Sequence, residues 1–188
     1  MTSITEKIKI LCADRNMSHE ELAAGAGLSV EQVQRICGND QMIPSLASLI
    51  KIARALGVRL GTFLDDSEEL GPVVNRGSES PGPVTFTSHQ TSSNSHMDFL
   101  SLAASKAGRN MEPFLIRIHA GKGDESTSTH EGEEFLFVLK GSIKVQYGSK
   151  HYILHKGDSI YYDSIVDHLV TAYDEAGATI IGVVYSPA

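Results

Sequence analysis

The sequence predicts two domains of different class, an all-α helical domain followed by an all-β barrel. Up to about residue 64, apolar residues recur at the spacing of amphipathic helices. Beyond residue 84, short runs of alternating apolar residues are separated by Gly-containing turns, as in a barrel of antiparallel strands. The stretch between them is rich in Gly, Pro and Ser and is typical of a linker. We therefore expect domains at residues 1–64 and 84–188, joined by a linker at 65–83.

The composition excludes several classes of protein. The chain has 188 residues, of which 41% are hydrophobic, and a net charge of −7, which favours a folded protein over a disordered one. No apolar run reaches the roughly 18 residues of a membrane span, and no secretory signal is visible at the N-terminus. The two cysteines, Cys12 and Cys37, lie in predicted helices, which excludes a disulfide framework. We expect a cytoplasmic protein that does not associate with membranes.

The N-terminal part contains four predicted helices and a short fifth. The second and third helices each begin with a capping box, at residues 18–21 and 29–32, in which two side chains satisfy backbone N–H groups. Gly27 provides a tight turn between them, and the fourth helix starts after Pro44 and ends at Gly57. Two short helices joined by such a turn are typical of a helix-turn-helix. The same pattern also fits a helical bundle with no DNA role.

Two segments of this part resemble the phage-repressor-type (XRE family) helix-turn-helix domains. The ordered residues of 17–29 and 44–58 carry the resemblance, which covers roughly residues 4–64. It implies that the third helix enters the major groove of DNA. The positions implied to contact DNA are His19, Ser29, Val30, Glu31, Gln32, Gln34 and Arg35. Among them, Gln34 and Arg35 have the chemistry that reads adenine and guanine, whereas Glu31 opposes close approach to phosphates.

The charge of the helical part favours an oligomer. Residues 1–61 contain seven basic and six acidic side chains, a net charge of +1. Because DNA affinity comes largely from neutralised phosphates, one such domain binds weakly by itself. Two copies would double the contacts and read two half-sites. We therefore expect a homodimer or higher homo-oligomer on a double-stranded DNA operator.

The C-terminal part carries two segments that resemble the sequence motifs of cupins, which are jelly-roll barrels. Residues 129–141 resemble the first motif and residues 157–168 the second, and the match spans about 97–186. The resemblance implies that His130, Glu134 and His168 hold a metal inside the barrel. Ser128 stands where another histidine is usual.

This His-Glu-His set leaves two interpretations open. Two imidazoles and a carboxylate suit one divalent metal, such as Fe, Zn, Mn or Ni, with positions left open. Alternatively, the site is metal-free and its histidines hydrogen-bond an organic ligand or water. Glu131 and Glu133, beside the set, are expected to face solvent or a neighbouring turn. The histidines that match no ligand position are His89, His96, His119, His151 and His155.

The order of the two domains is similar to that of bacterial ligand-responsive transcription regulators, whose barrel dimerises and senses a small molecule. We therefore predict a sequence-specific DNA-binding regulator with a small-molecule effector or metal in the barrel, and no catalytic residues. The alternative is a metal-dependent oxygenase or epoxidase acting on a small phosphonate-like substrate, because fosfomycin-type epoxidases share both domains and the triad. Two departures disfavour an enzyme. Asn16 and Met17 replace the phosphonate-binding lysine of those epoxidases, and residues 98–102 lack their tyrosines.

Overall fold

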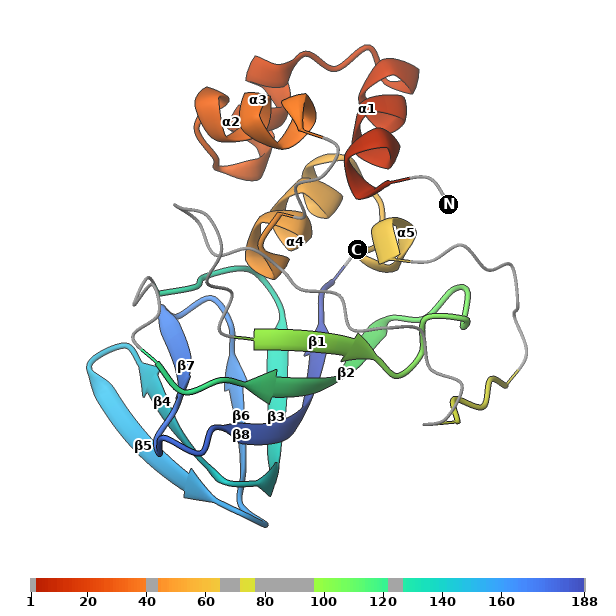
Figure 1. Cartoon of the computed structure of the whole chain (residues 1–188). Coiled ribbons are helices and arrows are strands. Elements are labelled where there is room, and N and C mark those ends of the chain that lie inside the picture. The colour runs from red at the N-terminus through yellow and green to blue at the C-terminus, as the bar shows by residue number, and fades with distance from the viewer. Residues whose placement is uncertain (1–2, 40–43, 65–71, 77–96, 122–126, 188) are drawn as a thin grey trace.

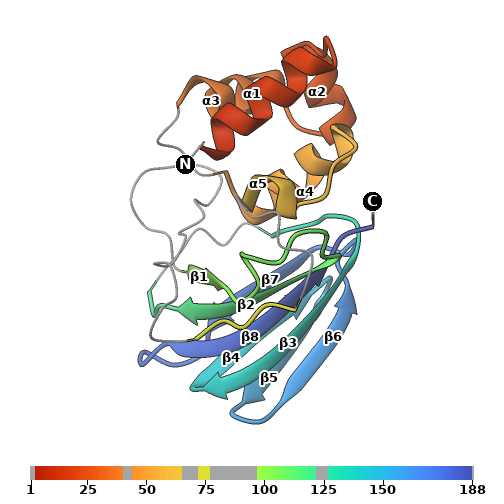
Figure 2. The same cartoon turned by 90° about the vertical axis from the view of Figure 1, so that its right-hand side faces the viewer.

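The computed structural model describes residues 3–39, 44–64, 72–76, 97–121 and 127–187. Within these ranges the chain forms a group of helices followed by a β-barrel, with the helices above the barrel in both views (Figures 1 and 2). Apart from residues 72–76, the predicted linker at 65–83 lies outside the described residues. The predicted start of the second domain at residue 84 also lies outside them.

The described helices are α1 (Ile4–Asp14), α2 (His19–Ala26), α3 (Val30–Gly38), α4 (Leu46–Ala55) and α5 (Gly61–Leu64). The helices α2, α3 and α4 begin directly after the residues at which the sequence predicted helix starts. A serine side chain accepts a backbone hydrogen bond at the start of each of the first four helices. Both predicted capping boxes, at Ser18 and Ser29, are present. These caps offset the cost of the free N–H groups in short helices.

The turn between α2 and α3 depends on Gly27. This residue caps α2 in the left-handed region, with φ of 61°, which glycine adopts without steric cost. The turn aims α3 across α2, and the buried faces of the two helices meet in the core. Leu22 and Val33 are fully buried there together with Leu49 of α4. The helix-turn-helix arrangement predicted from the sequence is therefore confirmed.

The barrel is made of two antiparallel sheets. The described strands are β1 (Met97–Ser101), β2 (Met111–Ile118), β3 (Glu133–Lys140), β4 (Ser142–Tyr147), β5 (Lys150–His155), β6 (Ser159–Asp163), β7 (His168–Ala172) and β8 (Ala178–Tyr185). The larger sheet has the order β1-β2-β8-β3-β6, and the smaller has the order β5-β4-β7. Strands distant in sequence are thus neighbours, as a jelly roll requires.

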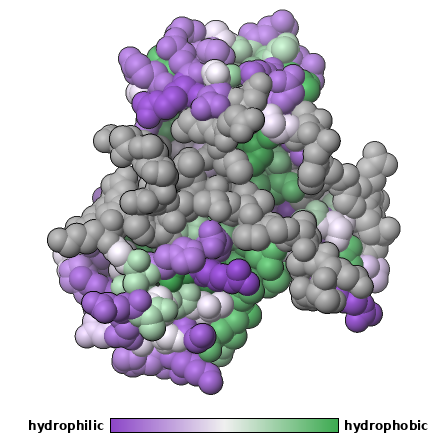
Figure 3. All heavy atoms as spheres, in the orientation of Figure 1, coloured by the Kyte–Doolittle hydropathy of each residue, from purple (hydrophilic) through white to green (hydrophobic). Residues whose placement is uncertain are grey.

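Alternation along the strands separates the barrel interior from its exterior. Phe114 and Ile116 of β2, Leu136 and Val138 of β3 and Ile180 of β8 are buried, whereas the residues between them are more exposed. In the orientation of Figure 3, the surface over the helices is mostly hydrophilic, and hydrophobic residues gather along the right-hand side of the barrel. Among the described helices, none is long and apolar enough to cross a membrane. The two-domain fold class predicted from the sequence is confirmed.

Candidate functional site

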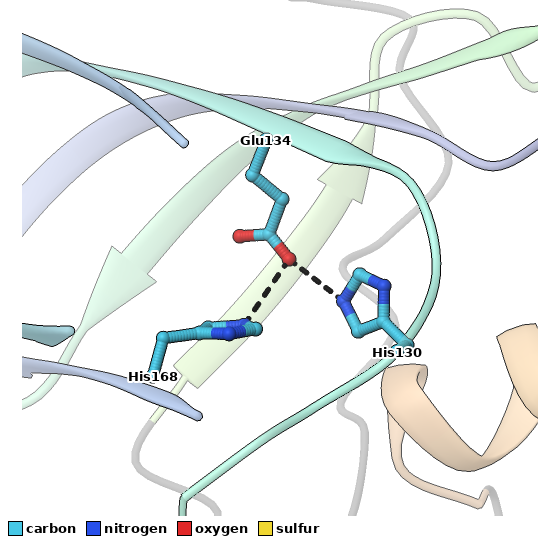
Figure 4. A group of neighbouring side chains, drawn as sticks. All are labelled: His130, Glu134 and His168. Atoms are coloured by element: carbon cyan, nitrogen blue, oxygen red, sulfur yellow. Dashed lines mark hydrogen bonds and ion pairs between the residues drawn. The ribbon is translucent and has the colours of Figure 1, made fainter. Parts of the chain in front are cut away.

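Three side chains from different parts of the barrel converge on one point (Figure 4). His130 lies in the loop before β3, Glu134 lies in β3, and His168 is the first residue of β7. Glu134 Oε1 is 2.8 Å from His130 Nε2 and 3.4 Å from His168 Nε2. One ligand atom from each residue lies within 4.8 Å of the others, and all three residues are buried. The fold therefore brings together the set that the sequence singled out.

The second ring nitrogen of each histidine is fixed by the backbone. His130 Nδ1 donates to the carbonyl of Glu131 at 3.0 Å, and His168 Nδ1 donates to the carbonyl of Val166 at 2.9 Å. Because a carbonyl only accepts, Nδ1 carries the hydrogen, and in a neutral ring Nε2 is then an acceptor. Two acceptor nitrogens and a carboxylate face one another. This arrangement needs a cation between them, either a proton or a metal ion.

The charges in the cluster favour such a cation. Burial by itself raises the pKa of Glu134, but hydrogen bonds and charge from His130 and His168 outweigh it and hold that pKa well below its usual range. Burial lowers the pKa of His168, yet the hydrogen bond and charge of Glu134 raise it above the ordinary value. The carboxylate therefore stays ionised at neutral pH and draws a proton or a metal to the imidazoles.

The donor set fits a divalent transition metal. Two imidazole nitrogens and one carboxylate oxygen suit ions such as Fe(II), and this combination leaves positions open for other ligands. Metal-binding histidines commonly donate their second nitrogen to a carbonyl, as both histidines do here. His130, Glu134 and His168 would hold the ion, and the ion would supply Lewis acidity and open positions for a small molecule.

Tyr162 is a fourth member of the cluster, which the sequence analysis missed. Its hydroxyl donates to Glu134 Oε2 at 2.6 Å, and its ring centre is 5.1 Å from that of His168. Burial, followed by the charge and hydrogen bond of Glu134, raises the pKa of Tyr162, so the phenol keeps its hydrogen. Tyr162 lies directly opposite Glu134 in the register of β3 and β6. The alternation of Ile160 and Tyr162 was the available signal for an inward phenol.

Gly132 shapes the loop that carries His130. Its φ is 106°, and an added Cβ would collide with the carbonyl of Tyr185. The Gly132 carbonyl accepts from Ser164 N at 2.9 Å, and His130 N donates to Ser164 O at 3.0 Å. These two bonds attach the loop to the segment between β6 and β7. They therefore hold His130 at the same end of the barrel as His168.

Ser128 lies opposite His168. Ser128 N donates to His168 O at 2.7 Å, and His168 N donates to Ser128 O at 2.9 Å, in an isolated antiparallel bridge. Side chains paired in this way point to the same face, with Cα atoms about 5.5 Å apart. The Ser128 side chain therefore lies on the same side of the backbone as the His168 ring.

The loop of the cluster also contacts the helical domain. Arg54 Nη1 of α4 donates to Glu131 Oε1 in an ion pair, and Arg54 Nη2 donates to the carbonyl of Gly25 in α2 at 3.5 Å. Glu131 follows His130 directly in the chain. The sequence analysis expected Glu131 to face solvent or a nearby turn, and the Arg54 contact was not predicted because 77 positions separate the two residues.

The third helix presents a polar face to solvent. Glu31, Gln34 and Arg35 are exposed, whereas Val33, Ile36 and Cys37 are buried. His19 and Val30 are half-buried. The backbone N–H of Glu31, followed by the Ser29 side chain, lowers the pKa of Glu31, so its carboxylate is ionised.

Two of the predicted DNA-contacting positions cap the third helix. Gln32 Oε1 accepts from Ser29 N at 2.8 Å, and Ser29 Oγ accepts from Gln32 N at 3.2 Å. The carbonyl oxygen of Gln32 and the hydroxyl of Ser29 are therefore engaged in stabilising the helix start. Gln34 and Arg35 are the exposed residues whose side chains suit base contacts.

Comparison with protein families finds a match for each of the two parts of the chain. Residues 7–69 match the Cro/C1-type HTH DNA-binding domain, and residues 114–184 match the cupin domain. The first match contains α2 to α5 and most of α1. The second contains His130, Glu134 and His168. The predictions of a repressor-type DNA-binding domain and a cupin barrel are therefore confirmed.

Some proteins are similar to this chain over nearly its whole length. The (S)-2-hydroxypropylphosphonic acid epoxidase of Streptomyces wedmorensis is 25% identical over 190 residues, covering 94% of this chain and 92% of that protein. The structure of an HTH_3 family transcriptional regulator from Vibrio cholerae has a TM-score of 0.71 at 23% identity, covering 100% and 97% of the two chains. The Fe(II) form of hydroxypropylphosphonic acid epoxidase has a TM-score of 0.51 at 25% identity, covering 98% of each chain. These proteins share the fold of this chain.

Proposed function

We propose that this chain, which carries a Cro/C1-type helix-turn-helix domain and a cupin domain, is a ligand-responsive transcription regulator. One observation carries the proposal: the same chain contains a DNA-binding domain and a buried His-Glu-His cluster that could hold a cation. A regulator of this kind acts in the cytoplasm, where its operator is present. The helical domain binds DNA, and the barrel responds to a metal or small molecule.

In the proposed complex, α3 enters the major groove and Gln34 and Arg35 contact base edges. Both are exposed, whereas the neighbouring Val33 is buried. His19, at the start of α2, lies near a phosphate, while Ser29, Val30 and Gln32 set the orientation of α3. The carboxylate of Glu31 repels phosphates, so specific contacts and a second copy of the domain supply the affinity that net charge does not.

The proposed sensor is the cluster of His130, Glu134 and His168. His130, Glu134 and His168 would hold a divalent ion in place of a proton, and the ion would supply open positions for a small effector. The response reaches the DNA-binding domain through Glu131, because its carbonyl accepts from the His130 ring and its side chain pairs with Arg54. A shift of the His130 loop thereby changes the position of α4 relative to the barrel.

The proposal is tested by selecting bound sequences from a random double-stranded DNA library with the full-length protein. Enrichment of one sequence with internal two-fold symmetry is the expected result, with an affinity that differs between protein stripped of metal and protein loaded with Fe(II), Zn, Mn or Ni. A binding-deficient control is Arg35→Ala combined with Gln34→Ala. Failure to enrich any sequence under either condition would contradict DNA-binding regulation.

A second candidate function is a metal-dependent epoxidase acting on a small phosphonate, favoured by the relationship to the phosphonate epoxidase and by the His-Glu-His cluster. Two observations weigh against it. β1 (Met97–Ser101) contains no tyrosine, and Asn16 and Met17 supply no cation for a phosphonate. Incubation of the Fe(II)-loaded protein with (S)-2-hydroxypropylphosphonic acid, oxygen and a reductant, followed by phosphorus NMR, decides between the two. We expect no epoxide.

A further inference from the structure

The hairpin of β4 and β5 is basic, although the chain as a whole is acidic. No acidic residue occurs between Glu134 and Asp158, whereas the net charge of the chain is −7. The basic residues of this stretch are all exposed, and they are Lys140, Lys144, Lys150, His151, His155 and Lys156. Among the described residues, no acidic side chain forms an ion pair with any of them. The hairpin is therefore a surface of positive charge.

β5 is the edge strand of this hairpin. The smaller sheet has the order β5-β4-β7, so within the described part of the chain β5 pairs with a strand on one side only. His155 N donates to Asp158 Oδ2 at 2.8 Å, and His155 O accepts from Asp158 N at 2.9 Å, so both backbone groups of His155 face away from β4. Because backbone groups alternate along a strand, those of His151 and Ile153 face the same side. They are in position to pair with another extended chain.

The side chains of β5 are exposed on both faces of the strand. Tyr152, on the face of the buried Leu154, is 40% exposed, and Ile153, on the other face, is 48% exposed. Lys150 shares its face with Tyr152, whereas His151 shares its face with Ile153. A chain that lies beside β5 would therefore meet apolar side chains at the centre of the strand and basic side chains towards its ends.

The charge of the hairpin selects the kind of chain that fits. Lysines on an edge strand oppose pairing with the same edge of a second copy, because like charges would then lie opposite each other. An acidic strand instead places opposite charges across the new ladder. A nucleic acid fits less well, since Lys144 and Lys150 lie on opposite faces of the hairpin. Both views also place β5 low on the barrel and away from α3 (Figures 1 and 2).

We propose that β5 binds an acidic segment of another protein, which joins the smaller sheet as a fourth strand. The backbone groups of His151 and Ile153 supply the hydrogen bonds, and the side chains of Tyr152 and Ile153 supply the apolar contacts. Lys150 attracts acidic residues at one end of the segment, and Lys156 attracts them at the other. This inference goes beyond the proposed function and does not depend on it, because neither the buried cluster nor α3 takes part.

The test measures the binding of a labelled synthetic peptide to the full-length protein by fluorescence anisotropy. The peptide has two glutamates at each end and three valines in the centre, and its side-chain pattern is the same in both directions, so parallel and antiparallel pairing are both measured. Wild type is expected to bind it. N-methylation of the three valines removes peptide N–H groups but keeps the charges, and is expected to weaken binding about tenfold. The same peptide with lysines for glutamates is expected not to bind.

Variants of the protein separate backbone pairing from charge. Ile153→Pro removes an N–H that faces away from β4, so it leaves the ladder with β4 intact and is expected to weaken peptide binding about tenfold. Ile153→Ala keeps that N–H and is expected to have a smaller effect. Lys150→Glu is expected to weaken binding about fivefold. Arg117→Glu, the same change of charge on the larger sheet, should bind like wild type. Thermal unfolding checks that each variant is folded.

Amide hydrogen exchange of wild type locates the contact without any substitution. The peptide is expected to slow exchange at His151 and Ile153, whereas the Tyr152 amide, which faces β4, should not change. Equal binding of the N-methylated peptide, or slowing confined to other residues, would overturn the inference. So would a wild type that binds no peptide but binds random-sequence DNA through Lys150, because the hairpin would then be a nucleic-acid surface. A protein that binds the peptide but selects no operator would overturn the regulatory function alone.

Discussion

Arg54 of α4 forms an ion pair with Glu131, the residue that follows the buried His130. The Glu131 carbonyl accepts from the His130 ring, and the Arg54 guanidinium also donates to the carbonyl of Gly25 in α2. Arg54 of the helical domain is therefore connected to the cluster of His130, Glu134 and His168 through one intervening residue, Glu131. Under the proposed function, this pair is the contact through which the barrel would influence DNA binding.

The first prediction concerns this pair. Glu131→Gln is expected to reduce the difference in operator affinity between metal-free and metal-loaded protein by up to about fivefold, because an exposed pair is worth at most about 1 kcal/mol. Fluorescence anisotropy with labelled operator measures both affinities. Glu133→Gln, a neighbouring carboxylate that contacts Tyr161, is the matched control and should respond like wild type. An unchanged metal response in Glu131→Gln would show that the signal takes another route.

The second prediction separates base contacts from helix capping on α3. Gln34→Ala and Arg35→Ala are each expected to weaken operator binding by roughly 1–3 kcal/mol, since each removes a base contact. Ser29→Ala instead removes a cap and should cost about 1 kcal/mol of unfolding free energy. Calorimetric unfolding and DNA titration of the three variants distinguish these effects. If Gln34→Ala and Arg35→Ala both bind like wild type while folded, another surface reads the operator.

The third prediction concerns the ligands of the cluster. His130→Ala, Glu134→Gln and His168→Ala are each expected to abolish most of the affinity for a divalent metal, because two remaining donors hold an ion poorly. Ser128→His should increase the affinity, since residue 128 pairs with His168 and presents its side chain to the same side. Isothermal titration with Zn and Mn measures both changes. Absence of metal binding in wild type and in Ser128→His would make the barrel a site for an organic ligand alone.

The fourth prediction is the pH dependence of metal binding. The pKa of His168 is raised in the folded protein, so a proton competes with the metal for its Nε2 atom below that raised value. Metal affinity is therefore complete only well above that raised pKa and is lost as the pH falls through it, a loss that begins above the ordinary imidazole value of about 6.5. Glu134, whose pKa is lowered, stays ionised throughout this range. Titrations between pH 5.5 and 8 measure the loss, and an affinity that is flat over this range would exclude the histidines as ligands.

The fifth prediction concerns Tyr162. Tyr162→Phe removes the hydrogen bond to Glu134 Oε2 but keeps the ring packed against His168. We expect a loss of metal affinity of about tenfold with nearly unchanged stability, because groups that orient a ligand commonly contribute this amount. Tyr147→Phe, which leaves the Glu134 contact in place, is the control. Equal metal affinities for the two variants would show that Tyr162 does not orient the carboxylate.

The sequence by itself determined the two-part fold class, the starts of α2 and α3 and the residues of the cluster. Capping boxes and apolar stripes are local, so the starts at Ser18 and Ser29 could be recognised from neighbouring residues. The strands β2, β3, β4, β6 and β8 were visible from alternation. β5 and β7 were not predicted, because the run from Lys150 to His155 carries exposed residues on both faces and β7 is too short to alternate clearly.

Only the tertiary structure decided which distant side chains meet. The phenol of Tyr162 reaches Glu134 because the register of β3 and β6 pairs the two residues, and Arg54 reaches Glu131 because α4 lies beside the loop before β3. A sequence pattern records the face on which each residue of a strand lies. Which strands lie side by side is set by long-range pairing, and no local pattern contains it.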